Sequence, residues 1–143
     1  MLNPLALPVH PILVHFSIAM LTAGWICLIV RYTSGDERWE DRWRTFELVG
    51  VCTLPVTIVT AFIDTRGFGF LIHPRTGAPL IWHMTSGLVA SAAFGGHYVW
   101  RRRVTANGGF TPERIAWDLA LVTFAMIALI ASGLIAGEMV YGS

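Results

Sequence analysis

Residues 119–137 read LALVTFAMIALIASGLIAG, an apolar run without a single charged side chain. A helix of this length reaches about 28 Å, close to the ~30 Å hydrocarbon core of a bilayer. Only helices and closed barrels satisfy their own backbone hydrogen bonds in lipid, and this run lacks the alternation of a barrel strand. The segment therefore predicts a membrane-spanning helix and an all-α protein.

Three more apolar segments precede this run, at about residues 10–30, 46–63 and 79–100, and the last span extends over about 115–141. The 143 residues are 55% hydrophobic and 13% charged, with a mean hydropathy of +0.60. Pro55 should kink the second span, and residues 36–44 (DERWEDRWR) predict a separate short interfacial helix before it. We expect one domain, an integral membrane four-helix bundle.

The arginines predict the orientation of this bundle. Arg66 and Arg75 follow the second span, whereas the other eight follow the first and third: Arg31, Arg38, Arg42, Arg44, Arg101, Arg102, Arg103 and Arg114. Cytoplasmic loops carry the excess of basic residues. We therefore expect a bacterial inner-membrane protein with both termini in the periplasm.

Several classes of function are disfavoured. A net charge of +1, with ten arginines against nine carboxylates, argues against a nucleic-acid partner. Cys27 and Cys52 lie within predicted spans without a CxxC pattern, which favours buried structural thiols. No P-loop, dinucleotide fingerprint or nucleophile with its base is present, so a self-contained enzyme is not expected.

Ionisable side chains within lipid are costly and point to function. Those of the predicted spans gather mainly at the outer end: His10, His15, Asp64, His83 and Glu138. His73 lies in the predicted loop above them. Four helices meeting there could form a shared polar pocket of the kind that bundles use for cofactors.

Haem b is the cofactor that these histidines suggest. His15 and His83 lie at similar depths and form the natural pair of axial ligands. His97 follows His83 by fourteen residues on nearly the same helix face, with Ser86, Gly87, Ala90 and Phe94 between them. These small residues either leave a groove for a macrocycle or let two helices approach closely. His97 is either a second ligand or, more simply, an interfacial ring that reaches toward the headgroups.

A polar stripe also marks the second span, with Gly50, Thr53, Thr57, Thr60 and Asp64 at spacings of three and four residues. A helix-packing face explains the stripe more simply than a proton path.

The run His10-Pro11-Ile12-Leu13-Val14-His15-Phe16, the Thr60-to-Asp64 end of the second span and His83 together resemble a known family. It comprises small four-helix bacterial and archaeal membrane proteins of unknown function, some fused to Rieske or cytochrome c domains. The resemblance implies a membrane module associated with electron transfer.

Three functions follow as expectations. The first is a haem b electron-transfer subunit that serves a periplasmic or membrane redox protein, or quinone. The second is a haem-free accessory or anchoring subunit of a larger respiratory or photosynthetic complex. The third is a site for Zn or Cu, because these ions accept mixed imidazole and carboxylate ligands; its ligands would come from His10, His15, Asp64, His73 and His83.

Overall fold

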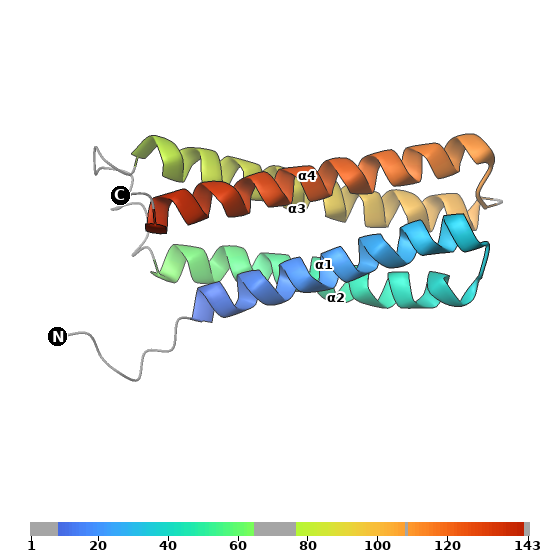
Figure 1. The fold of residues 1–143 in the computed structure, drawn as a ribbon, viewed down its shortest axis with the longest axis horizontal. Coiled ribbons are helices and arrows are strands. Elements are labelled where there is room, and N and C mark those ends of the chain that lie inside the picture. The colour runs from blue at the N-terminus through green and yellow to red at the C-terminus, as the bar shows by residue number, and fades with distance from the viewer. Residues whose placement is uncertain (1–8, 65–76, 108, 142–143) are drawn as a thin grey trace.

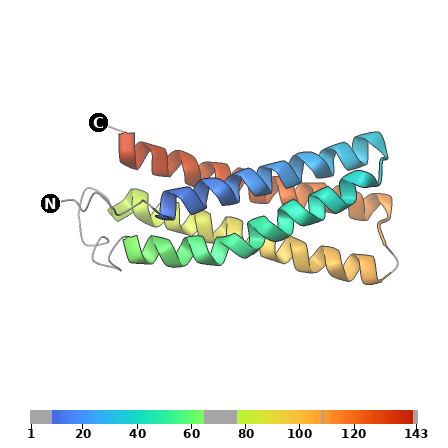
Figure 2. The same cartoon turned by 90° about the horizontal axis from the view of Figure 1, so that it is seen from below.

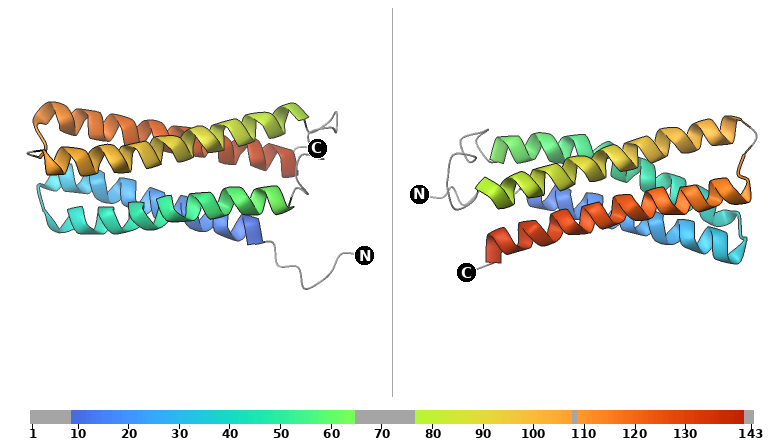
Figure 3. Two further views of the ribbon diagram at one scale, coloured as in Figure 1. Left: turned by 180° about the vertical axis from the view of Figure 1, so that it is seen from behind. Right: turned by 90° about the horizontal axis from the view of Figure 1, so that it is seen from above.

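The computed structural model describes residues 9–64, 77–107 and 109–141, which form four antiparallel helices (Figure 1). Their bounds are α1 Val9–Ser34, α2 Arg38–Asp64, α3 Gly77–Ala106 and α4 Pro112–Tyr141. α1 packs against α2 and α3 against α4, and the two hairpins meet where α1 contacts α4 and α2 contacts α3. The views from below, behind and above show the same two side-by-side hairpins (Figures 2 and 3). The predicted all-α bundle is confirmed.

The two ends of the bundle differ in what they carry. The α1–α2 and α3–α4 connections lie at one end, here called the hairpin end (Figure 1). The start of α1 and the end of α4 lie at the opposite end, called the terminal end, together with the end of α2 and the start of α3. An even number of antiparallel helices thus places both termini of the helical bundle on the same side.

The outer surface of the bundle is apolar, whereas part of its interior is polar. Large apolar side chains are exposed on the outside, among them Leu134 at 68% and Ile127 at 62%. Among the described residues, the buried polar side chains are Ser17, Glu47, His97, Arg101, Asp118 and Ser132. Within the described residues, α1, α2 and α4 are long and apolar enough to cross a membrane. An apolar outer surface around a partly polar interior is expected of a protein that is surrounded by lipid.

Two boundaries differ from the sequence prediction. The predicted interfacial helix over residues 36–44 is not a separate element, because α2 runs without interruption from Arg38. Asp36 caps that helix, since the Arg38 amide donates to its Oδ1 at 2.9 Å. At the preceding turn, Gly35 adopts a φ of 70°. α2 bends along its length (Figure 2) and contains Pro55, which lacks an amide proton for the helix ladder.

α3 also continues beyond its predicted end. It passes Arg101 and reaches Ala106, because a run of arginines marks the edge of the hydrocarbon without ending the helix. The two cysteines are both free, but only Cys27 is buried, so the prediction of two buried thiols is wrong for Cys52, which is exposed.

Candidate functional site

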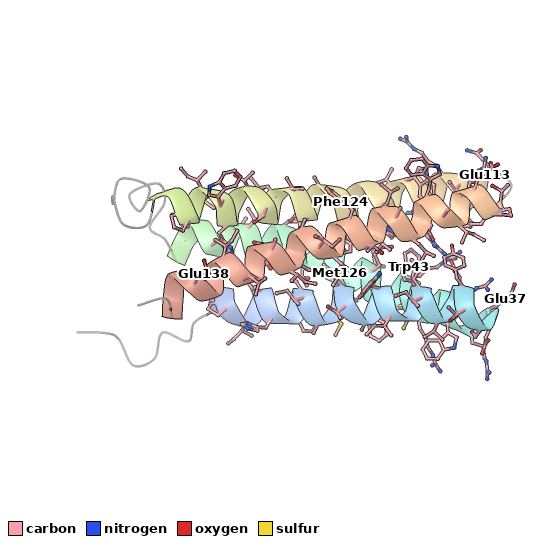
Figure 4. All side chains as sticks on the ribbon, turned by 45° about the horizontal axis from the view of Figure 1, so that its top comes forward. Glu37, Trp43, Glu113, Phe124, Met126 and Glu138 are labelled. Atoms are coloured by element: carbon pink, nitrogen blue, oxygen red, sulfur yellow. The ribbon has the colours of Figure 1, made fainter. Side chains whose placement is uncertain are left out.

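All four helices contribute to one group of ionisable side chains toward the hairpin end, here called the ionic cluster. Its members are Tyr32 of α1, Glu40 and Glu47 of α2, His97 and Arg101 of α3, and Asp118 of α4. Asp118 lies six residues into α4, about 9 Å along the axis from the start of that helix. In Figure 4, Glu37 and Glu113 mark the hairpin end, and Trp43 lies between the two hairpins.

Helical periodicity explains why these side chains converge. Glu40, Trp43 and Glu47 recur at intervals of three and four residues along α2, so they share one face. His97 and Arg101 are four residues apart on α3 and share a face in the same way. Since α2 contacts α3, these two faces meet inside the bundle.

His97 lies between two carboxylates. Its Nδ1 is 2.5 Å from Glu47 Oε1 and its Nε2 is 2.8 Å from Asp118 Oδ1. The three residues are at most 2% exposed. An ionised carboxylate only accepts hydrogen bonds, so both contacts require either an imidazolium or a protonated carboxyl group beside a neutral ring. The triad therefore holds one proton more than a neutral histidine with two carboxylates.

Arg101 joins the triad to α2 and α1. Its Nη2 donates to both carboxylate oxygens of Glu40, at 2.7 and 2.6 Å, and its Nη1 donates to Asp118 Oδ2. The Tyr32 hydroxyl donates to the same Asp118 oxygen at 2.6 Å. Asp118 thus accepts hydrogen bonds from α1 and α3 and ties both helices to α4.

Aromatic rings pack against the cluster. The Arg101 guanidinium carbon lies 3.9 Å from the Trp43 ring centroid and 4.5 Å from that of Phe110. Trp43 also meets the His97 ring edge-on, with centroids 5.8 Å apart. These contacts hold the guanidinium and the imidazole against aromatic rings.

The charge of the cluster is unevenly balanced. Glu40, Glu47 and Asp118 carry three carboxylates, whereas Arg101 and a protonated His97 supply two positive charges. Arg44 compensates Glu40 from the surface, with its Nε donating at 3.0 Å. Glu47 Oε2 is buried without a hydrogen-bond partner among the described residues. Glu47 therefore meets the rest of the cluster through one oxygen only, its Oε1 beside His97.

A groove borders the cluster between α2 and α3. It has a volume of about 520 Å³, and Trp43 and Arg101 of the cluster region line it together with the exposed Arg44 and Arg102. The groove makes the guanidinium side of the cluster the part nearest to a molecule arriving from outside the bundle.

His97 was expected to be either a haem ligand or an interfacial ring. The interfacial interpretation is wrong, because the residue is only 2% exposed and lies in the bundle interior. Both of its ring nitrogens are taken by carboxylates, which leaves neither for iron in this arrangement.

The predicted ligand pair at the terminal end is not brought together. His15 is exposed and shares its helix face with Ile26, which is 51% exposed, while its Nδ1 lies 2.6 Å from the Pro11 carbonyl. His83 faces α4, with its Nδ1 2.9 Å from the Ser132 carbonyl oxygen. The two imidazoles therefore point in different directions, and a haem shared by both does not fit this arrangement.

The face between His83 and His97 is also filled. A Cβ added to Gly87 would lie 3.4 Å from Ser132 Oγ, and Ala90 is fully buried. Of the two uses proposed for these small residues, close helix approach is therefore the one observed.

The other predicted site residues lie apart from the cluster. His10 faces α2, with its Nδ1 3.0 Å from the Thr57 carbonyl oxygen. Glu138 is exposed on α4 at the terminal end (Figure 4). His73, the loop above the helices and the side chain of Asp64 lie outside the described residues. Within the part of the chain that is described, no three His, Cys, Asp or Glu side chains are placed to hold a metal ion.

The sequence analysis missed every member of the ionic cluster except His97, and among those missed Glu47 and Asp118 carried a signal. Each lies inside a predicted span, at the second and fourth positions of residues 46–63 and 115–141. The cost of a carboxylate at such a depth is itself the signal that could have found them.

Fold and site together define an integral membrane helical bundle with a buried ionic cluster. Residues 6–143 match the family model described as "Predicted membrane protein (DUF2231)", and the chain belongs to this family. Comparison with curated proteins and with solved structures gave no match.

Proposed function

We propose that this chain is a small inner-membrane subunit that transfers protons for a redox partner, with Glu47, His97 and Asp118 as the relay. The observation that carries the proposal is the position of His97 between two buried carboxylates, at 2.5 and 2.8 Å. The excess proton of this triad can occupy either carboxylate or the ring without any movement of heavy atoms. Buried ionisable groups of this kind mark proton relays in membrane proteins.

Glu40 is the carboxylate of the cluster that reaches the surface, and Arg101, which stays protonated, holds it close to Asp118. The Glu40 side chain is 20% exposed and shares Arg101 with the buried Asp118. The groove beside Arg101 gives a quinone headgroup or a partner subunit access to this side of the cluster. A redox partner is proposed because the run from His10 to Phe16 resembles that of membrane modules associated with electron transfer.

The hairpin end is proposed to face the cytoplasm. It carries eight of the ten arginines, which is the distribution expected of cytoplasmic loops. In this orientation all four helices span the inner membrane and the relay exchanges protons with the cytoplasm. A reporter domain that is active only in the periplasm should be active when it is fused after residue 143. Activity of a reporter that works only in the cytoplasm, fused at the same position, would reverse the assignment.

Infrared spectroscopy of the protein in lipid nanodiscs tests the relay. Absorption bands of protonated carboxyl groups should change as the pH is varied, and Glu47→Gln and Asp118→Asn should each remove part of that change. Glu138→Gln is the control, because Glu138 is exposed at the terminal end, away from the cluster. This change should leave the carboxyl bands of the cluster as they are in the wild type. A triad whose protonation stays constant over every pH at which the protein is folded would exclude a relay.

Haem b remains a second candidate, favoured by one observation. Metal-bound histidines usually donate one ring N–H to a carbonyl, and the Nδ1 atoms of His83 and His15 both lie within hydrogen-bond distance of backbone carbonyl oxygens. Each ring would then present Nε2, although the two do not face each other within one bundle. A Soret band lost in His83→Ala would support haem, whereas a colourless folded protein favours the relay in a haem-free accessory subunit.

A further inference from the structure

A second group of polar side chains lies nearer the terminal end than the ionic cluster, along the α1–α2 interface. Four hydroxyl-bearing residues and one histidine, here called the hydroxyl row, line this interface: His10, Ser17, Thr53, Thr57 and Thr60. On α2 the threonines follow Glu47 and Gly50 at intervals of three and four residues, so the row and the cluster share one helix face.

Side-chain contacts form two sets within the row, which meet at the Thr57 carbonyl oxygen: it accepts from Thr60 Oγ1 at 2.9 Å and lies 3.0 Å from His10 Nδ1. His10 Nδ1 lies 3.3 Å from Thr60 Oγ1, near the terminal end. Ser17 Oγ lies 3.3 Å from Thr57 Oγ1 and donates to Thr53 Oγ1 at 2.8 Å. Thr53, the member of the row nearest in sequence to Glu47 on α2, donates to the Gly50 carbonyl at 2.7 Å. Hydroxyls are donors and acceptors at once, which is the property that a proton path requires.

Leu21 separates the row from the cluster. Thr53 and Glu47 are six residues apart, about 9 Å along the axis of α2. Between them lies Gly50, and a Cβ built there would be 2.6 Å from Leu21 Cγ and Cδ2. Leu21 is only 1% exposed, so its side chain fills the space over Gly50.

We propose that the hydroxyl row and the ionic cluster are two halves of a transmembrane proton path, closed in this structure by Leu21 against Gly50. The proposal rests on the relay function and adds the terminal side of the membrane as its second access. The transported species is a proton, because the row offers only hydroxyls and an imidazole and the cluster ends in carboxylates and an imidazole.

Proton flux into liposomes tests the path, with a pH-sensitive dye inside and an imposed pH difference and membrane potential. Leu21→Ala should raise the flux by on the order of tenfold or more, because small reductions of a barrier multiply a rate. Leu21→Gln, which conserves volume and adds polar groups, should also raise it. Leu28→Ala is the matched control, because Leu28 lies on the same face of α1 and is fully buried.

Second-site changes show which groups carry the proton. Thr53→Val and His97→Asn, each combined with Leu21→Ala, should return the flux to the wild-type level. Flux that persists without His97 would overturn the path through the cluster. Unchanged flux in both folded Leu21 variants would overturn the path as a whole, while the infrared titration of the triad would still decide the relay separately.

Discussion

Replacing Asp118 by Asn tests whether the ionic cluster holds the two hairpins together. The change keeps the shape of the side chain but removes its charge. Asp118 is 0% exposed and accepts hydrogen bonds from the Tyr32 hydroxyl and Arg101, with His97 as its third partner. Asn offers one acceptor oxygen, which can replace Oδ2 toward Tyr32 and Arg101, while its NH2 group then faces His97 Nε2 and Arg101 loses a charged partner.

The expected loss in free energy of unfolding is about 3 kcal/mol. Removing one partner of a buried ion pair costs about 3–5 kcal/mol, because the other charge is left uncompensated. Arg101 retains both oxygens of Glu40, at 2.7 and 2.6 Å, which places the expected cost at the lower limit of this range. A similar change at the exposed Glu138, also on α4, should cost less than about 0.5 kcal/mol.

Reversible unfolding in mixed detergent micelles, or steric trapping in bicelles, measures both variants. Arg101→Gln should cost less in the Asp118→Asn background than alone, with a coupling energy of about 1–3 kcal/mol. If Asp118→Asn is no more destabilising than Glu138→Gln, the cluster does not join the hairpins and the structural argument fails.

Two further predictions concern α2. Gly50→Ala should destabilise the bundle by about 1–3 kcal/mol, because its Cβ would lie 2.6 Å from the branched carbon of Leu21; the same unfolding assay checks this, and an unchanged stability would contradict the close contact. Hydrogen bonds from the Arg38 side chain and amide lower the pKa of Asp36, so its contribution to stability is complete above its ordinary pKa of 3.8 and is lost as the pH falls through the lowered value. Asp36→Asn should flatten this acid limb of the stability profile, which unfolding at a series of pH values would show.

Apolar runs such as residues 119–137 were enough to predict the fold, because lipid allows few alternatives to a helix of that length. They did not predict where the helices end. Backbone groups at headgroup level still need hydrogen bonds, so α2 begins at Arg38 and α3 continues to Ala106. Hydropathy predicts which residues lie within the hydrocarbon core. The helix itself continues beyond that core until a capping residue or a turn ends it.

The candidate site was less predictable because it depends on helix rotation as well as depth. His15 and His83 were paired by depth, yet His15 faces outward with Ile26 while His83 faces α4. The position of each histidine around its helix axis, measured from the buried face of that helix, shows that the two side chains point in different directions. His97 was predicted to be either a haem ligand or an interfacial ring, because its carboxylate partners come from α2 and α4, which no local pattern on α3 reveals.

The stability of the bundle does not by itself explain why the cluster is present. Apolar side chains gain little from helix association in lipid, so close packing and polar contacts must hold the helices together. Small residues already provide such packing at Gly50 and Gly87, without the cost of burying charge. Apolar replacements of buried ion pairs are often as stable as the ions. A cluster that leaves Glu47 Oε2 without a partner among the described residues is a poor structural device, and a group that exchanges protons accounts for it better.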